Sequence, residues 1–167
     1  QSPFTMHKTV LDLIDREAVL ARAGKSARIM VKMNSLSEVQ TIDALYRASQ
    51  AGVKIDLIIR GVCALRPGIE GISDNIRVRS IVGRFLEHAR VFYFQNDGAA
   101  EIYLSSADWM GRNFFNRVET AFLLEDKRLQ QRVLKECFNN YLGDNTRAWL
   151  LRSDGSYTRV KPGSARV

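Results

Sequence analysis

Residues 28–60 read RIMVKMNSLSEVQTIDALYRASQAGVKIDLIIR and carry the clearest structural pattern in the chain. Two short runs rich in aliphatic and β-branched residues, 28–33 and 54–59, predict strands. Between them, hydrophobic residues recur at helical spacing until Gly52, which is typical of a helix end. A strand, a helix and a strand in this order form a βαβ unit with parallel strands, so we expect an α/β fold.

The ends of the predicted helices have signals of their own. Ser37 and Gln40 have the spacing of a capping box, which predicts that the helix of the βαβ unit begins there. Upstream, hydrophobic residues at helical spacing predict an amphipathic helix over 5–23. Gly24 follows it in the position of a left-handed terminating residue.

After Arg60 the pattern changes to short strands. The stretch 61–75, rich in Gly and Pro, is expected to be a loop. Strands are expected at 76–81, 90–94, 101–104 and 118–124, with a turn at 96–98, a closing helix at 127–141 and a hairpin within 148–160. We therefore predict a single domain, 1–167, with a mixed β-sheet flanked by helices and a C-terminal hairpin.

The composition favours a folded protein with an anionic partner. Of the 167 residues, 46% are hydrophobic and 26% charged, which excludes general disorder. The hydrophobic runs are too short to span a membrane and no secretory signal is evident, so a cytosolic location is expected. The net charge of +7 favours nucleotides, nucleic acid, polyphosphate or an anionic membrane surface. Two separated cysteines and two histidines are too few ligands for an ordinary zinc site.

Polar residues at the ends of the predicted parallel strands form a first candidate site. Asn34 and Ser35 follow strand 28–33, and Arg60 follows strand 54–59. Open α/β sheets bind ligands beyond the carboxyl ends of such strands, and an arginine there can hold a phosphate through two hydrogen bonds. From its position alone, Arg60 can equally be an ordinary surface or ion-paired arginine.

A second group of candidates surrounds the strands 90–94 and 101–104. His88 and Arg90 are expected on one face of the incoming strand, where a histidine beside an arginine suits an anion. The following segment supplies two hydroxyls, an acid, an arginine and an amide: Ser105, Ser106, Asp108, Arg112 and Asn113. The alternative is structural, with an ordinary polar histidine and a helix N-cap followed by a surface turn.

The order His88-x-Arg90, a strand, and then Ser-Ser-Ala-Asp-x-x-x-Arg-Asn over 105–113 resembles half of a phospholipase D-type site. The pattern of that superfamily is His-x-Lys-x4-Asp followed by Gly-Ser-x-Asn. Here Arg90 stands in the lysine position and Gln95 in the aspartate position. These departures argue against a phospholipase or nuclease and favour the branch of the fold that handles phosphoanhydrides.

Longer strings resemble the C-terminal catalytic domain of bacterial polyphosphate kinases. They are LIDRE (13–17), KMNSL (32–36), IDALYRAS (42–49), AGVKI (51–55), IRGVC (59–63), LRPG (65–68), RFLEHAR (84–90) and Ser105, Ala107-Asp108-Trp109-Met110 and Asn113. The resemblance covers about residues 7–143. It implies a phospholipase D-like fold and a larger ATP:polyphosphate phosphotransferase, of which this chain is the last part.

Carried onto this sequence, the resemblance makes Arg60 and His88 contacts to the nucleotide phosphates, with His88 as the catalytic candidate. Arg90 and Arg117 are weaker candidates along the polyphosphate path. The phosphorylated histidine, the magnesium-associated arginines and the adenine site belong to preceding domains. This chain is therefore expected to hold half of an active site and to be inactive alone.

The same resemblance implies the ligands and partners. ATP or ADP and inorganic polyphosphate are the expected substrates, Mg²⁺ is the expected cofactor with its ligands outside this chain, and no specific nucleic acid is expected. The full-length enzyme is expected to be a homo-oligomer, either free in the cytoplasm or peripheral at the inner face of the membrane.

Two other functions are compatible with the residues. One is a nuclease or phosphodiesterase with one histidine motif per chain, whose site is completed by homodimerisation. The other is a non-catalytic module that uses its basic charge to hold nucleic acid or polyphosphate. Turnover of a generic phosphodiester identifies the first, and salt-sensitive binding without turnover identifies the second.

Overall fold

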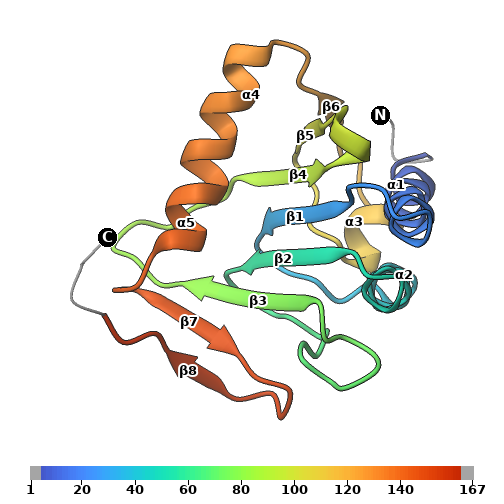
Figure 1. The fold of residues 1–167 in the computed structure, drawn as a ribbon. Coiled ribbons are helices and arrows are strands. Elements are labelled where there is room, and N and C mark those ends of the chain that lie inside the picture. Colours follow the sequence, from blue (N-terminus) through green and yellow to red (C-terminus); the bar gives the residue numbers. More distant parts are fainter. Residues whose placement is uncertain (1–4, 163–167) are drawn as a thin grey trace.

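The predicted βαβ unit forms the centre of the protein, in a computed structural model that describes residues 5–162 (Figure 1). β1 (Arg28–Met33) and β2 (Lys54–Ile59) are parallel, and α2 (Val39–Gln50) connects them. β3 (Ile76–Ile81) pairs with β2 and is parallel to it. The parallel arrangement expected for residues 28–60 is therefore confirmed.

Antiparallel strands extend the sheet on both sides, so that it has eight strands within the described residues, in the order β6-β5-β4-β1-β2-β3-β7-β8. β4 (Arg90–Phe94), β5 (Glu101–Ser105) and β6 (Ala121–Leu123) lie beyond β1. β7 (Ala148–Leu151) and β8 (Tyr157–Arg159) lie beyond β3 and form the predicted C-terminal hairpin. The mixed sheet and the hairpin are both confirmed.

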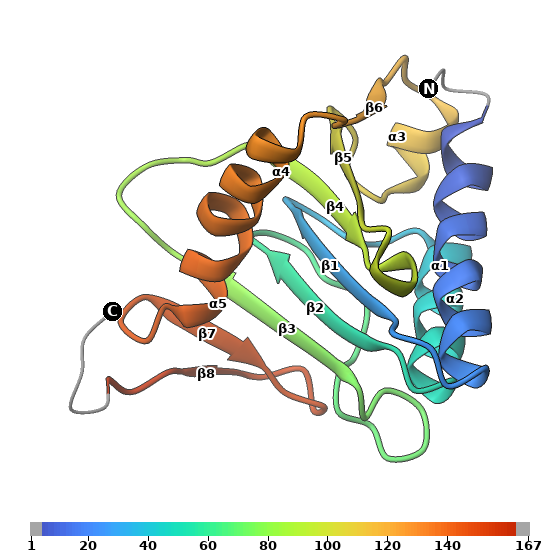
Figure 2. The ribbon, with the colours of Figure 1, turned by 45° about the horizontal axis from the view of Figure 1, so that its top comes forward.

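One face of the sheet is covered by the two longest helices (Figure 2). α1 (Met6–Arg22) packs beside α2, and both contribute to the larger hydrophobic core. Ile14 of α1, Leu45 of α2 and Val31 of β1 are fully buried in it. Burial of such side chains contributes on the order of 2 kcal/mol each, so this layer holds the sheet in place.

The opposite face is covered by a continuous helical segment (Figure 2). It consists of α4 (Lys127–Val133), a π-helical stretch over Leu134–Asn139 and α5 (Asn140–Gly143). Phe138 of the π-helical stretch is fully buried and belongs to a second core with Met30 of β1. Alternate residues of β1 thus face opposite cores, as the two-residue period of a strand requires.

The capping box predicted from Ser37 is not the cap of α2. Glu38 is the N-cap residue, because its carboxylate accepts hydrogen bonds from the backbone N–H groups of Gln40 at 3.0 Å and of Thr41 at 2.7 Å. A carboxylate at this end also interacts favourably with the helix dipole. Sequence spacing alone did not distinguish the serine from the adjacent glutamate.

Other element boundaries also differ from the prediction. The strand expected over 118–124 shortens to β6, and the helix expected over 127–141 continues to Gly143 through the π-helical stretch. The expected turn at 96–98 is a short 3-10 helix, η1 (Asn96–Gly98). None of the helices within residues 5–162 is long and hydrophobic enough to cross a membrane.

The strand directions bring several chain segments to one edge of the sheet. β1, β2 and β3 end there, β4 begins there because it is antiparallel to β1, and β5 ends there because it is antiparallel to β4. The segments after β1, β2, β3 and β5 and the segment before β4 therefore meet. We call this the carboxyl edge, and it is the position at which open α/β sheets bind ligands.

Candidate active site at the carboxyl edge

Asp108, which follows β5, is the central hydrogen-bond acceptor of the carboxyl edge. Its buried side chain accepts a hydrogen bond from the backbone N–H of Asn34 at 2.8 Å. It also accepts from Arg90, through Nε on one carboxylate oxygen and Nη2 on the other, both at 3.2 Å. A buried carboxylate needs such partners. Asp108 therefore joins the end of β1 to the start of β4 and is not free to act on a ligand.

His88 and Arg90 do not share a strand face, which corrects the prediction. β4 begins at Arg90, and His88 lies in the preceding loop with an exposed side chain. Nη1 of Arg90 donates to the backbone carbonyl oxygen of His88 at 2.7 Å. Arg90 therefore holds the backbone of His88 while the imidazole stays accessible. The alternation rule failed because it applies only within a strand.

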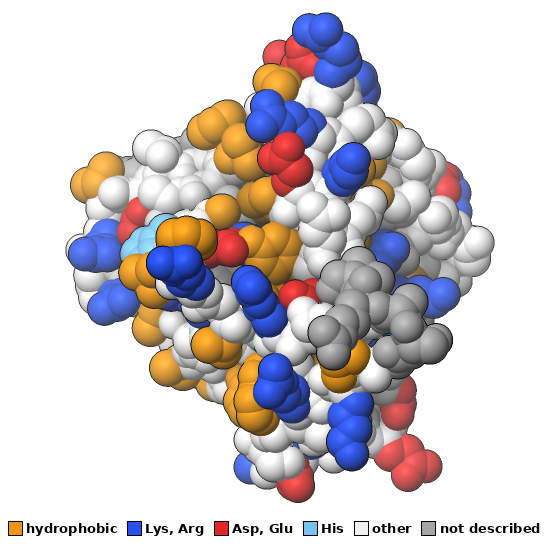
Figure 3. Space-filling view, turned by 90° about the vertical axis from the view of Figure 1, so that its left-hand side faces the viewer, with side chains coloured by type: hydrophobic (Ala, Val, Ile, Leu, Met, Phe, Trp, Pro, Cys, Tyr) orange, Lys and Arg blue, Asp and Glu red, His pale blue; other side chains and the backbone are white. Residues whose placement is uncertain are grey.

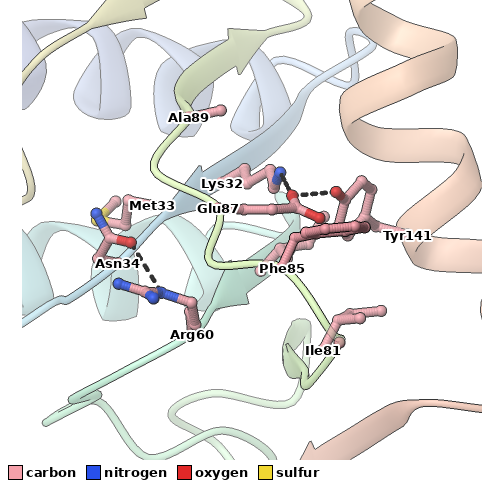
Figure 4. Close-up of a pocket in the computed structure, with 11 residues that line it drawn as sticks. Lys32, Met33, Asn34, Arg60, Ile81, Phe85, Glu87, Ala89 and Tyr141 are labelled. Carbon is pink, nitrogen blue, oxygen red and sulfur yellow. Dashed lines mark hydrogen bonds and ion pairs between the residues drawn. The ribbon is translucent and has the colours of Figure 1, made fainter.

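Arg60 lies just after β2, and its guanidinium is only partly engaged. Its Nε donates to Oδ1 of Asn34 at 3.0 Å, across the ends of β1 and β2 (Figure 4). Among residues 5–162, the Arg60 side chain hydrogen-bonds through Nε alone. Nδ2 of Asn34 is buried and also has no partner among these residues. Two guanidinium nitrogens of Arg60 are thus available to the oxygen atoms of an anion.

The close approach of these strand ends depends on Gly61. Its backbone N–H donates to the carbonyl oxygen of Asn34 at 2.7 Å. A Cβ atom at this position would lie 3.1 Å from the same oxygen and 3.2 Å from Oγ of Ser35. A larger residue would therefore push the ends of β1 and β2 apart and weaken the contact between Arg60 and Asn34.

The two serines at the end of β5, Ser105 as its last residue and Ser106 directly after it, hold the following loop in place. Oγ of Ser105 donates to the carbonyl oxygen of Thr120 at 3.0 Å. Ser106 donates to the carboxylate of the buried Glu119, which also accepts from Nδ2 of Asn113 at 2.6 Å. The polar atoms of both serines are engaged in these contacts, so the structural alternative describes them better than a ligand site.

Arg112 and Arg117 lie in the segment that connects β5 to β6. Arg112 belongs to the short helix α3 (Gly111–Phe115), Arg117 follows it, and both are exposed. The contacts described for residues 5–162 do not join either arginine to Arg60 or His88. Both stay candidates for long-range attraction of an anion, which exposed charges can provide.

Three residues that the sequence analysis did not select form a charged cluster beside Arg60 (Figure 4). Lys32 of β1 is buried, Glu87 precedes His88, and Tyr141 lies in α5. Nζ of Lys32 donates to Oε2 of Glu87 at 2.5 Å and lies 4.0 Å from the centre of the Tyr141 ring. The Tyr141 hydroxyl donates to the same Oε2. The sequence signal that could have identified this cluster is a lysine within a hydrophobic strand, because a buried lysine requires a partner.

The pKa shifts within this cluster keep its two charges. Burial lowers the pKa of Lys32, but hydrogen bonds with Glu87 and Tyr141 outweigh burial and raise the pKa above its ordinary value of 10.5. Burial raises the pKa of Glu87, but the hydrogen bonds with Lys32 and Tyr141 and the charges of Lys32 and Arg60 bring it below its ordinary value of 4.5. At neutral pH Lys32 is therefore a cation and Glu87 an anion.

Basic and hydrophobic side chains lie together on the face of the molecule that contains the carboxyl edge (Figure 3). Exposed hydrophobic residues near the edge are Val82, Phe85 and Leu86 before β4, and Val118 and Phe122 around the start of β6. Exposed hydrophobic groups of this size are typical of surfaces that contact another protein segment. The edge thus combines free cationic groups with a surface suited to being covered.

The side chains of this chain do not fit a protein-built magnesium site. Among residues 5–162, no three His, Cys, Asp or Glu side chains lie close enough together to hold a metal ion. Mg²⁺ prefers oxygen ligands, and the Asp108 carboxylate at the carboxyl edge is already paired with Arg90. We therefore assign no magnesium ligand to this chain.

The arrangement of sheet and helices is a phospholipase D-like fold. The chain aligns with Nuc, a phospholipase D family member from Salmonella typhimurium, with a TM-score of 0.59 over 92% of this chain and 90% of that one. With NucT from Helicobacter pylori the TM-score is 0.52 over 82% and 91%. Since the sequence identities are 16% and 12%, these similarities concern the fold alone. The predicted fold class is confirmed.

The sequence comparisons define the family. The profile of the polyphosphate kinase C-terminal domain 2 matches residues 1–167. The polyphosphate kinases of Paraburkholderia phytofirmans and Neisseria meningitidis serogroup B are 59% and 61% identical over 99% and 97% of this chain. This chain belongs to the polyphosphate kinase C-terminal domain 2 family, as the resemblance of its sequence strings implied.

A solved structure agrees with this assignment. The polyphosphate kinase from Porphyromonas gingivalis has a TM-score of 0.92 and 39% identity over 97% of this chain. The chain covers 25% of that protein and 24% of each of the two curated relatives. It thus spans about a quarter of the length of the proteins it matches.

Proposed function

We propose that this chain supplies half of the active site of an ATP:polyphosphate phosphotransferase, which transfers the terminal phosphate of ATP reversibly to inorganic polyphosphate. The observation that carries the proposal is the state of Arg60: Asn34 orients its guanidinium, two of whose nitrogens have no hydrogen-bond partner among residues 5–162, at the edge where His88 is exposed. The family of the chain and the names of its relatives support the choice of substrates.

The chemistry of phosphoryl transfer fits the groups at the carboxyl edge. Catalysis of this reaction depends mainly on positive donors that are already in place, because charge develops on the phosphoryl oxygens. Arg60 supplies a permanent charge in a fixed orientation. His88 supplies an imidazole, a group that can donate a proton, accept one or hydrogen-bond to a phosphate oxygen. Arg90 holds the His88 backbone and is itself fixed by Asp108.

In this proposal the covalent step belongs to preceding domains of the same polypeptide. A histidine there takes the phosphoryl group from ATP and passes it to the end of the polyphosphate chain, so that one transfer becomes two. The adenine site and the groups associated with Mg²⁺ lie there as well. It follows that the 167-residue chain alone does not make polyphosphate from ATP. We further propose a homo-oligomeric enzyme, cytoplasmic or peripheral at the inner membrane face, with no specific nucleic acid partner.

The phosphodiesterase alternative has less support. In the phospholipase D pattern a lysine follows the histidine by two residues, and here that position is Arg90, which is engaged by the buried Asp108. A homodimer of this chain that hydrolyses a generic phosphodiester would favour the alternative. Salt-sensitive binding of polyphosphate by the full-length protein without turnover would favour the non-catalytic module.

His88→Gln in the full-length polypeptide that contains this chain tests the proposal. We expect polyphosphate synthesis to fall by about 10²–10⁴-fold, as is typical when acid–base help is lost, while thermal unfolding stays unchanged. His7→Gln is the matched control, since His7 contacts Glu38 at 3.0 Å and no group of the proposed site. A folded and fully active His88→Gln enzyme contradicts the role of this residue.

Measurement of the phosphoenzyme on the same preparation separates the two transfers. If His88 acts mainly in the second transfer, the His88→Gln enzyme still carries phosphate on its upstream histidine. If His88 assists the first transfer, the phosphoenzyme does not form. Robust synthesis of polyphosphate by the isolated chain would contradict the half-site arrangement.

A further inference from the structure

The loop that presents His88 has little hydrophobic anchoring of its own. Residues 82–89 connect β3 to β4 and are exposed, and the side chains of Phe85 and Leu86 are 78% and 74% exposed. A segment with few buried hydrophobic contacts opens easily unless polar contacts hold it. Glu87, the residue next to His88, makes such contacts with β1 and α5. The position of the loop therefore depends on Glu87, together with the hydrogen bond from Arg90 to the His88 backbone.

The ion pair of Glu87 differs from an ordinary surface ion pair. Its partner Lys32 is buried on β1, with 8% of its side chain exposed, whereas the Glu87 side chain is 46% exposed. If the loop lifted away, Glu87 would regain water, and Lys32 would lose its hydrogen bond to Glu87 and keep its contact with the Tyr141 ring. Leaving a buried charge without its partner is far more costly than breaking an exposed pair. The pair therefore favours the closed position of the loop.

Tyr141 completes the contact from the opposite side. Its ring lies against Nζ of Lys32 and its hydroxyl donates to Glu87, so three elements meet at one carboxylate oxygen (Figure 4). The end of α5 is itself fixed, because Nη1 of Arg79 donates to the carbonyl oxygens of Tyr141 at 2.9 Å and Asp144 at 2.8 Å. The Tyr141 ring is thus held over Lys32.

The residue that orients Arg60 lies directly after β1, the strand that carries Lys32. Asn34 follows Lys32 by two residues at the end of β1 and accepts the hydrogen bond from Arg60. The positive charge of Arg60 is close enough to contribute to the lowered pKa of Glu87, after burial, which raises it, and after the larger lowering effects of Lys32 and Tyr141. β1 and the residue after it therefore position both groups: Lys32 holds the loop that carries His88, and Asn34 orients Arg60.

We propose that Lys32, Glu87 and Tyr141 form a clamp that holds the loop 82–89 so that His88 faces the same phosphate group as Arg60. Lys32 and Glu87 are then positioning residues for phosphoryl transfer, acting through His88. This inference rests on the proposed function and adds residues to it.

Glu87→Gln in the full-length polypeptide is the first test, because it removes the charge and keeps the size. We expect kcat for polyphosphate synthesis to fall by about 10- to 100-fold, as for a small misplacement of a reacting group, with little change in KM for ATP. Glu136→Gln is the matched control. It breaks an ion pair with Arg132 at 2.7 Å whose glutamate is 53% exposed, close to the exposure of Glu87, and we expect unchanged kinetics.

A double-mutant cycle with His88→Gln separates positioning from general stability. If the clamp acts through His88, Glu87→Gln causes no further loss of kcat in the His88→Gln enzyme. If Glu87→Gln lowers kcat by the same factor in both backgrounds, the clamp inference is overturned and the proposed function is not. If His88→Gln alone is fully active, the proposed site is overturned and the clamp with it.

A second variant covers the case in which Glu87→Gln fails to fold because Lys32 is left unpaired. Lys32→Met together with Glu87→Gln removes the buried charge and its partner at once, and such replacements are often neutral for stability. This double variant then enters the same cycle with His88→Gln. Loss of kcat that disappears in the His88→Gln background supports the clamp, and loss that persists there overturns it.

Discussion

The two sides of the carboxyl edge are held in different ways. Around Asp108 the polar groups are buried and hydrogen-bonded to one another, with Arg90 and the backbone of Asn34 as partners. The loop 82–89 is exposed. Near its C-terminal end, Glu87 holds it through the ion pair with Lys32. The buried side maintains the geometry of the strand ends, and the exposed side presents the imidazole.

The two arginines of the edge show the same contrast. Arg90 uses three guanidinium nitrogens on Asp108 and on the His88 backbone. Within residues 5–162, Arg60 uses Nε alone, on Asn34. A sequence motif treats both as candidate phosphate ligands, but only an arginine with unpaired donors can hold a phosphate without first losing a structural contact. We therefore expect substitution of Arg90 to affect stability and substitution of Arg60 to affect phosphoryl transfer.

The largest expected effect is on the buried side. Asp108→Ala removes the acceptor of Arg90 and of the Asn34 backbone, and we expect the free energy of unfolding to fall by about 3 to 5 kcal/mol, because the largely buried Arg90 cation, with 16% of its side chain exposed, loses its partner. Denaturant unfolding of this chain measures the change. Asp12→Ala serves as the control, since Asp12 forms an exposed pair with Lys8 and exposed pairs contribute little. Equal losses of unfolding free energy in Asp108→Ala and Asp12→Ala would contradict the structural role assigned to the buried side of the edge.

The second expected effect is a loss of polyphosphate synthesis without a loss of stability. In the full-length polypeptide, Arg60→Ala should lower polyphosphate synthesis by about 100-fold, the effect typical of losing one fixed donor to a transition state, with an unchanged unfolding temperature. Arg132→Ala, which removes an exposed arginine from α4, is the control. If Arg60→Ala changes stability and leaves synthesis intact, Arg60 is structural like Arg90.

The smallest effect concerns pH and the clamp. The pKa of Glu87 is lowered in the folded chain, so its stabilising contribution is present above its ordinary value of 4.5 and is lost as the pH falls through the folded value. The raised pKa of Lys32 adds stability that is complete below 10.5 and is lost only at more alkaline pH. Of these two residues, only Glu87 therefore contributes to a change of stability in acid.

Thermal unfolding of this chain and of its Glu87→Gln variant, followed from about pH 7 to about pH 3, checks this sign. We expect the unmodified chain to be more stable at neutral pH and the two curves to converge in acid. A difference in stability that is constant over the whole range would show that the charge of Glu87 does not stabilise the loop.

Local patterns predicted the central elements well. The βαβ unit over 28–60, the loop after it and the terminal hairpin follow from hydrophobic periodicity and from Gly and Pro positions, and all are present. The errors are local: Glu38 replaces Ser37 as the cap, the strand expected over 118–124 shortens to β6, and His88 lies outside the strand whose face it was expected to share. Helix caps and strand starts depend on which of several neighbouring residues finds a partner, and spacing does not carry that information.

The candidate site was predicted in part. The position of Arg60 and Asn34 at a carboxyl edge followed from the parallel strands, whereas His88 lies in the loop before β4 and not on the strand face expected for it. The contact roles proposed for Arg60 and His88 stay predictions, as do those of Arg112 and Arg117. Ser105, Ser106 and Asp108 were selected as polar residues of a motif, but their side chains hydrogen-bond within the protein.

The sequence by itself determined the α/β class, the parallel centre of the sheet and the family, because these depend on local periodicity and on strings of residues that are read in order. Only the tertiary structure showed which polar groups are already paired and which are free. Arg90 with Asp108, and Lys32 with Glu87, are 18 and 55 residues apart in the chain. Such partners are chosen by strand direction and burial, and the cost of an unpaired buried charge applies only once the sheet has brought them together.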